Sequence, residues 1–312
     1  MKNIVTFLFL LFFLAAKAQL PDHVYQPGIH SVKLFKYGDI FSYPVLKLNS
    51  GDMLELHFDD MGTDIKYCYY TYQLCNVDWT PSTLQYYDYI RGFQSIRITN
   101  YRNSSIANTR YVHYQATLPD RNSVPTMPGN YLLKVFLNND TSQLLFTKRF
   151  LVVDPRVAVT AKLVQPFKVH SLRVNQRVQA EVSTLNTQIN TLSPQDLKVV
   201  ILQNNIWPSA VLIDRPTIYR GNYYLYNDDA TEFAAGREWR WFDLRSLRLR
   251  GDRVQSIVDT SKRTEVYVNT DGERRNLLYT YYRDQNGLFT IVNMDGYNPY
   301  WQGDYGYVHF TY

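Results

Sequence analysis

The chain of 312 residues carries 33 basic and 28 acidic side chains, which gives a net charge of +5 at neutral pH. This excess is too small to indicate a nucleic-acid-binding protein, because phosphate recognition requires clustered Lys and Arg. Tyr is unusually common, with 27 residues, whereas Gly and Pro are moderate in number. The composition therefore predicts folded domains rather than disordered or fibrous segments.

The N-terminal stretch MKNIVTFLFLLFFLAAKAQL has the pattern of a secretory signal peptide. Basic Lys2 precedes an apolar run at residues 4–16, and Ala16-Lys17-Ala18 supplies small residues before a cleavage site after Ala18. The run is too short to span a bilayer, which requires roughly 20 apolar residues. We therefore expect residues 1–18 to be removed and the remaining chain, with a net charge of +3, to be exported without direct membrane insertion.

A two-residue periodicity, which is typical of β-strands, runs through the rest of the chain. In MLELHFDD it places Leu54, Leu56 and Phe58 on one face, and YLLKVFL at 131–137 shows the same alternation. Asn286-Gly287, between LLYTYYRD and LFTIV, is a strong hairpin signal. These patterns predict an all-β fold of tandem β-sandwich domains, Ig-like or E-set-like.

The two cysteines lie in the segment YCYYTYQLC, residues 67–75. As a strand, it places Cys68, Tyr70 and Leu74 on one face and Cys75 on the other, with roughly 23 Å between the cysteines. A disulfide tolerates only about 6 Å between Cα atoms, so the chain would have to fold back, although an exported protein permits a disulfide. We predict buried, free thiols in a strand, and an intramolecular disulfide is the alternative.

Known catalytic motifs such as G-x-S-x-G, H-E-x-x-H, the P-loop and the dinucleotide-binding glycine fingerprint are absent from the sequence. The six histidines are scattered without metal-ligand spacing, and two cysteines alone cannot form a structural zinc site. Adjacent acids at Asp59-Asp60 and Asp228-Asp229 fit loop or capping positions, although a glycosidase can draw its two carboxylates from distant strands. We predict a protein that is not an enzyme, with no catalytic residue, no metal site and no cofactor.

The stretch VVDPRV, residues 152–157, marks the predicted domain boundary. The strand-like segment FTKRFLVV ends there, and Pro155 cannot donate a ladder hydrogen bond. We place the first sandwich at residues 19–154 and the second at 155–312. Because the chain ends inside a strand-like alternation, we expect the second domain to be incomplete.

Two segments are candidates for a partner interface. The first, which we call the aromatic loop cluster, surrounds and follows the turn Asp78-Trp79-Thr80-Pro81. Clustered aromatic side chains on loops suit sugar stacking or a protein interface, and burial under a long loop is the alternative. The cluster comprises Trp79, Tyr86, Tyr87, Tyr89 and Phe93.

The second candidate, which we call the arginine segment, is GREWRWFDLRSLRLRGDR at residues 236–253. Its alternation of Trp or Leu with Arg is interrupted at 242–246, which predicts a bulge or bend in a long strand. It fits a basic, aromatic contact surface for a partner or an anionic lipid head group, or a half-buried strand with solvated or paired arginines. The predicted interface residues from both segments are Trp79, Tyr86, Tyr87, Tyr89, Arg240, Trp241 and Arg248.

Several segments, in their order along the chain, resemble the plug protein family of the type IX secretion system in Bacteroidota. They are DHVYQPGIHSVKLF (22–35), SYPVLKLNSGDMLELHFDDM (42–61), YYTYQLCNVDWTPS (69–82), GNYLLKVF (129–136), VVDPRV (152–157), VVILQNNIWPSAV (199–211) and GREWRWFDLRSLR (236–248). Cys75 lies in the family-like Cys-Asn-Val-Asp-Trp stretch, whereas the resemblance gives no role to Cys68.

The resemblance implies a non-enzymatic periplasmic protein, attached to the outer membrane through a protein partner. That partner would be the giant SprA-type outer-membrane β-barrel translocon, whose periplasmic opening the protein would occlude between export events. The rival hypothesis is a carbohydrate-binding β-sandwich of the periplasm or cell surface, with Trp79, Tyr86 and Tyr87 as stacking platforms. A secreted β-sandwich hydrolase is a third, weaker alternative.

Overall fold

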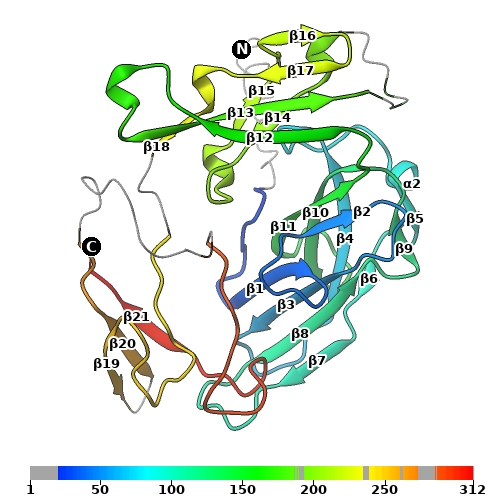
Figure 1. Ribbon diagram of the computed structural model, residues 1–312. Helices are drawn as coiled ribbons and strands as arrows, with labels where there is room; N and C mark the ends of the chain where they lie inside the picture. Colours follow the sequence, from blue (N-terminus) through cyan, green and yellow to red (C-terminus); the bar gives the residue numbers. More distant parts are fainter. Residues whose placement is uncertain are drawn as a thin grey trace, which may run out of the picture. The chain divides into compact units, whose positions relative to one another are not determined.

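The computed structural model describes residues 20–311 except 186, 188, 190–192, 235–238, 261–262, 273–284 and 286 (Figure 1). The predicted signal peptide and the strand expected at 277–284 lie outside the described residues, as does the start of the arginine segment. The chain separates into two compact units. Unit 1 comprises residues 1–104 and 110–154, and unit 2 comprises residues 105–109 and 155–312.

Unit 1 contains two larger sheets and one short strand pair. The four-stranded sheet has the order β1-β3-β8-β7, and the five-stranded sheet has the order β2-β11-β10-β4-β6. Neighbouring strands are antiparallel except β2, which is parallel to β11. The bounds are β1 (Ile29–Lys36), β2 (Val45–Lys47), β3 (Leu54–Asp60), β4 (Cys68–Cys75), β5 (Ile90–Gly92), β6 (Ile96–Arg97), β7 (Asn100–Asn103), β8 (Val112–Leu118), β9 (Ser123–Pro125), β10 (Gly129–Leu137) and β11 (Leu144–Val153), and the one-turn helix α2 spans Tyr86–Tyr89.

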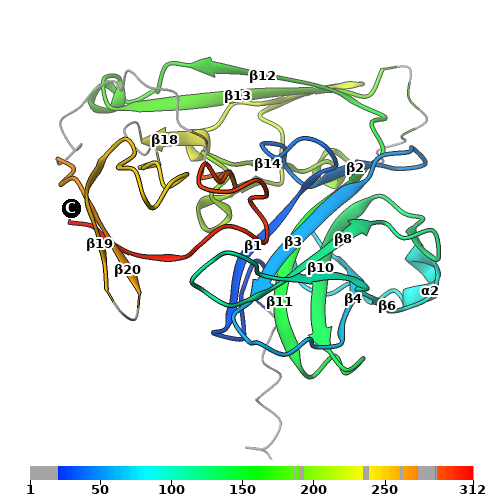
Figure 2. The ribbon, with the colours of Figure 1, turned by 90° about the horizontal axis from the view of Figure 1, so that it is seen from below.

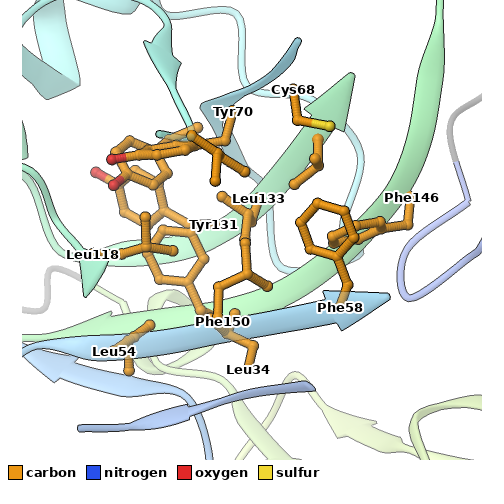
Figure 3. Packing of buried hydrophobic residues seen from close by; sticks show 14 of the residues in the cluster. Leu34, Leu54, Phe58, Cys68, Tyr70, Leu118, Tyr131, Leu133, Phe146 and Phe150 are labelled. Carbon is orange, nitrogen blue, oxygen red and sulfur yellow. The ribbon is translucent and has the colours of Figure 1, made fainter. Parts of the chain in front are cut away.

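A single hydrophobic core receives side chains from both larger sheets of unit 1 (Figure 3). Leu54, Leu56 and Phe58 of β3 are completely buried in it, which confirms the face predicted from their alternation. The Phe58 ring meets Phe146 of β11 edge-on, with 5.0 Å between ring centroids. Burying each such side chain stabilises the fold by about 1.5–3 kcal/mol.

Several buried tyrosines combine a ring in the core with a hydroxyl group that reaches the backbone of a loop. Tyr131 of β10 is fully buried, and its hydroxyl donates to the Met127 carbonyl oxygen at 2.8 Å. The Tyr114 hydroxyl accepts a hydrogen bond of 2.7 Å from the backbone N–H of Lys66. A buried Tyr hydroxyl needs such a partner, because an unsatisfied polar group in the core is costly. The abundance of Tyr thus serves the core as well as the surface.

Both cysteines are buried and free, as predicted. Cys68 belongs to the core of unit 1 together with Tyr70 and Leu74, whereas Cys75 lies outside that cluster. Burial raises the pKa of the Cys68 thiol to about 12 and that of Cys75 to about 11. Both groups are therefore protonated thiols near neutral pH.

Unit 2 consists of short sheets and turns. Its largest sheet has the order β12-β13-β17-β16, with β18 also paired to β13, and a small core around Tyr224 and Tyr226 packs against it. The bounds are β12 (Ala158–Val164), β13 (Asn175–Ser183), β14 (Val199–Ile201), β15 (Val211–Ile213), β16 (Ile218–Arg220), β17 (Tyr223–Tyr226), β18 (Glu232–Ala234), β19 (Val254–Asp259), β20 (Thr264–Val268) and β21 (Gly306–His309), and short 3-10 helices span Val169–Ser171, Pro194–Asp196, Trp207–Ser209 and Asp229–Thr231.

The all-β class is confirmed, since strands dominate both units. The more specific assignment to Ig-like or E-set-like sandwiches stays a prediction. One local prediction is wrong: LFTIV at 288–292, the expected second arm of the hairpin, contains no strand.

The long strand predicted for the arginine segment is also wrong, because residues 239–253 contain no strand. In this segment, side-chain oxygen atoms accept hydrogen bonds from the backbone N–H groups that would otherwise bond to a neighbouring strand. Asp243 accepts from the N–H of Arg245 at 2.9 Å, and Asp295 accepts from the N–H of Leu247 at 2.9 Å. The Ser246 hydroxyl accepts from the N–H groups of the two residues at 248 and 249. Such local bonds favour turns over strands.

Candidate functional site

The three tyrosines of the aromatic loop cluster lie on helix α2, which directs them to different sides. The helix begins at Tyr86, where the Asp88 side chain accepts from the N–H of Gln85 at 2.8 Å and the N–H of Asp88 donates to the backbone carbonyl oxygen of Gln85 at 3.0 Å. Residues three apart share one face of a helix, so Tyr86 and Tyr89 point the same way. Their rings meet edge-on, with centroids 5.7 Å apart, and Tyr89 is buried in the core. Tyr87 lies on the other side and is 77% exposed.

Tyr86 is half-buried, and its hydroxyl is engaged within unit 1. It hydrogen-bonds to the Phe93 carbonyl oxygen and lies 3.0 Å from the Ser123 Oγ atom. These contacts hold the segment 90–93 against the loop that precedes β9. Tyr86 therefore positions the loop, and only part of its ring is accessible to a partner.

Trp79 is buried in the turn that sequence analysis singled out. Its φ of 67° lies in the left-handed region, and its N–H donates to the Asn76 carbonyl oxygen at 3.0 Å. The guanidinium carbon of Arg149, on β11, lies 4.9 Å from the centroid of the ring, and Asp22 pairs with this Arg at 2.6 Å. A cation stacked on an aromatic face occupies the surface that a sugar would use. Trp79 thus offers no open ring face to a ligand in this structure.

The accessible apolar part of this region is narrower than the predicted cluster. Tyr87 and Phe93 are 77% and 65% exposed, and Leu84 is also exposed. We call these three side chains the exposed loop residues. Exposed Arg91 lies on β5, two residues before Phe93, and exposed Arg121 lies in the loop that precedes β9. An exposed apolar group with a polar rim is typical of protein–protein contact surfaces.

In unit 2, Arg240 and Trp241 line a pocket of about 640 Å³. The pocket is also lined by Arg253, Asp271 and Phe310. Asp271 forms ion pairs with the guanidinium groups of both Arg240 and Arg253. The guanidinium of Arg253 lies 5.0 Å from the centroid of the Trp241 ring. The pocket thus combines apolar walls with a shared charge cluster, which suits a protruding side chain of a partner.

Arg248, the third predicted interface residue of the arginine segment, is exposed and does not line this pocket. Its backbone N–H donates to the Ser246 hydroxyl oxygen at 3.1 Å. The Ser246 hydroxyl in turn donates to the Asp295 carboxylate, which stabilises this turn. The structure therefore brings Arg240 and Trp241 together and leaves Arg248 on a separate turn. The role of all the predicted interface residues stays a prediction.

Sequence analysis missed an array of four polar side chains on β3 and β8. The Nδ1 atom of His57 lies 2.9 Å from Nε2 of His113, and its Nε2 lies 2.9 Å from Oε1 of Glu55. The Nδ1 atom of His113 lies 2.6 Å from Oδ1 of Asp59. Both histidines are buried. The alternation of Glu55, His57 and Asp59 in the sequence places these three side chains on one face of a strand. The array could be predicted only with the strand register, which sets Asp59 opposite His113.

Burial lowers the pKa of His57 to about 4, so this ring is neutral at pH 7. A neutral imidazole has one N–H donor and one nitrogen acceptor, so His57 donates in one of its two contacts and accepts in the other. The array therefore links β3 and β8 through side-chain hydrogen bonds inside unit 1.

None of the helices in the described ranges has the length and apolar content that crossing a membrane requires. In the same ranges, no group of three or more His, Cys, Asp or Glu side chains is arranged to hold a metal ion.

The fold of this chain is similar to that of a solved bacterial protein. A crystal structure of a hypothetical protein from Parabacteroides merdae aligns with a TM-score of 0.88 and 28% identity, over 94% of this chain and 74% of that chain. The Pseudomonas fluorescens alkylpurine DNA glycosylase AlkC, bound to DNA with an abasic site analogue, aligns with a TM-score of only 0.24 and 13% identity, over 47% of this chain and 33% of that chain. The comparison with curated proteins found no match.

A family comparison covers most of unit 1. The sequence model of the family described as "Type 9 secretion system plug protein 1st domain" matches residues 29–154. This range begins with β1 and ends just after β11, so it contains both larger sheets of the unit. The comparison therefore supports a relationship of residues 29–154 to the type 9 secretion system plug protein family.

Proposed function

We propose that this protein occludes the periplasmic opening of the SprA-type outer-membrane translocon of the type IX secretion system. The observation that carries the proposal is the family match over residues 29–154. The plug family is a structural component of secretion rather than an enzyme family, and we propose a role without catalysis. The signal-like residues 1–18 support a periplasmic location.

The physical requirement is a rigid, folded body that binds reversibly. A lumen wide enough for folded cargo leaks unless a compact domain fills its mouth. Unit 1 provides such a body, because its two larger sheets share one core of tightly packed aromatic and aliphatic side chains. Release during export requires that contacts with the barrel be few and local.

We place the contacts of unit 1 at the exposed loop residues Leu84, Tyr87 and Phe93. Tyr and Phe are enriched at the centres of protein interfaces, and these two rings are among the more exposed ones in the unit. In unit 2, Arg240 and Trp241 at the pocket and Arg248 on the separate turn are the proposed contacts. Arg and Trp are frequent interface anchors for the same reason.

The test is affinity purification from the native host. The mature protein is tagged, the envelope is solubilised gently, and co-purifying proteins are identified and quantified. A stoichiometric, very large outer-membrane barrel is the expected result. Recovery of the tagged protein alone, with the translocon intact in the same extract, would overturn the proposal.

A matched set of variants separates docking from folding. The double variant Tyr87→Ala/Phe93→Ala should reduce recovery of the barrel at least several-fold while leaving thermal stability unchanged. Tyr37→Ala removes an exposed ring elsewhere in unit 1, at 57% exposure, and should leave recovery unchanged. A glycan array with the same proteins checks the carbohydrate alternative, which predicts binding that is lost on Trp79→Ala.

A further inference from the structure

The edge strand β12 uses only one of its two sides for backbone pairing. It pairs antiparallel with β13 along all seven residues, from Ala158 opposite Ser183 to Val164 opposite Arg177. Within the described part of the chain, no strand pairs with its other side, and Figure 2 shows it running along the margin of its sheet. Successive residues of a strand direct their N–H and C=O groups to opposite sides, so about half of these groups face outward.

The side chains of β12 are also uncovered. Every residue from 158 to 163 is exposed, and Val159 and Leu163 are 62% and 68% exposed. Cross-strand partners share a face of the sheet, and the partners of Val159 and Ala161 are Val182 and Ala180 in the core of unit 2. Val159, Ala161 and Leu163 therefore extend the core-facing side of the sheet as an apolar row, and on the outer side of this row no strand of the described residues is paired.

The opposite face of β12 carries a charge. Lys162 lies 3.5 Å from Glu181 of β13, and its side chain is 58% exposed. If two copies of β12 paired antiparallel about Ala161, their two Lys162 side chains would become diagonal neighbours at about 7–8 Å. Lysine on an edge strand is a common device against self-association. An acidic residue opposite Lys162 on a different strand would instead form an attractive cross-strand pair.

We propose that β12 is a docking edge that adds an extended segment of another polypeptide as a further strand of this sheet. The segment would carry apolar residues at alternate positions, on the face of Val159 and Leu163, and an acidic residue opposite Lys162. The backbone edge supplies affinity, and the side chains supply register and choice of partner. This inference stands on β12 alone and does not depend on the plug function.

The first test measures a charge preference. Fluorescein-labelled synthetic heptapeptides with alternating Val and Thr carry either Glu or Lys at the centre, and their binding to the intact mature protein is measured by fluorescence anisotropy. The Glu peptide should bind more tightly than the Lys peptide, and Lys162→Glu should reverse the preference. Hydrogen exchange at residues 158–164 should slow when the Glu peptide binds. Failure of both peptides to bind, or the same preference in Lys162→Glu, would overturn the proposal.

The second test uses adjacent proline substitutions. Thr160 and Ala161 direct their N–H groups to opposite sides of β12, so Pro at one position removes a bond to β13 and Pro at the other removes only an outward donor. The variant that keeps wild-type thermal stability should bind the Glu peptide roughly three- to tenfold more weakly. Unchanged affinity in that variant would contradict docking at this edge. Concentration-dependent dimers that Ala161→Lys abolishes would assign the edge to a second copy of the chain and overturn the proposal.

Discussion

Two tyrosines of α2, Tyr87 and Tyr89, provide a stringent test of how this loop is built. Tyr89 is 6% exposed, and its ring packs edge-on against Tyr86 and Tyr131 with centroid distances of 5.7 and 6.0 Å. Tyr89→Ala removes that ring, and truncation of a buried aromatic side chain costs about 3–5 kcal/mol. Tyr89→Phe keeps the ring and should cost less than about 1.5 kcal/mol. Tyr87 is 77% exposed, so Tyr87→Ala should change stability by no more than about 0.5 kcal/mol.

The assay must report on unit 1 alone, since the chain contains two units. Native-state hydrogen exchange of the amides in β10, residues 129–137, measures the free energy of opening that unit. Circular dichroism of each variant checks that its strand content is unchanged. If Tyr87→Ala lowers this free energy as much as Tyr89→Ala does, or if Tyr89→Ala lowers it by less than about 1 kcal/mol, the assignment of inner and outer sides of α2 is refuted.

Three further predictions concern titration, thiol reactivity and backbone conformation. Burial lowers the pKa of His57 to about 4 from its usual 6.5. As pH falls through that interval, the unfolded chain binds a proton before the folded one does, so stability should fall by up to about 3 kcal/mol. Denaturant titrations at stepped pH measure this loss, and it should be smaller in His57→Gln. Cys68, whose thiol pKa is raised to about 12 by burial, should resist iodoacetamide at pH 8 until denaturant is added. Mass spectrometry reads out this modification, and rapid alkylation of the native protein would contradict the burial. Gly92 has a φ of 108°, and a Cβ atom there would lie 2.0 Å from the Asn122 carbonyl oxygen. Gly92→Ala should therefore destabilise unit 1 by at least about 2 kcal/mol in thermal denaturation, whereas Gly51→Ala, which meets no atom within 4 Å, should change stability little.

Alternation in the sequence correctly predicted the apolar face of β3. Leu54, Leu56 and Phe58 are buried in the core, and the intervening His57 and Asp59 are also buried, on the face that carries the polar array. The same reasoning failed for the arginine segment, where Asp295 binds the backbone of Leu247 from 48 residues away. A local pattern cannot show that a distant carboxylate will satisfy an N–H group. The alternation there reflects composition rather than pairing.

The candidate interface was predictable as a region but not residue by residue. The cluster of aromatic side chains between 79 and 93 indicated where to look, yet only tertiary contacts decide which rings are open. Arg149 stacks on Trp79 from a strand 70 residues away. Tyr86 and Tyr89 face one side of α2 and Tyr87 faces the other, because residues three apart share a face of a helix. The sequence could have predicted this helical turn from Gln85 and Asp88, whose spacing is that of a capping pair.

The strand order of unit 1 also constrains when the chain can fold during synthesis. β11 lies between β2 and β10, and it ends at Val153, beside the end of the unit at Asp154. The early strand β2 therefore has no partner in its sheet until nearly the whole unit has been synthesised. Contacts between residues so distant in sequence form slowly and leave strand edges open to aggregation meanwhile. Once Val153 has emerged, however, all strands of both larger sheets are present, and the region that carries the plug-family match can complete its core while the strands of unit 2 are still following.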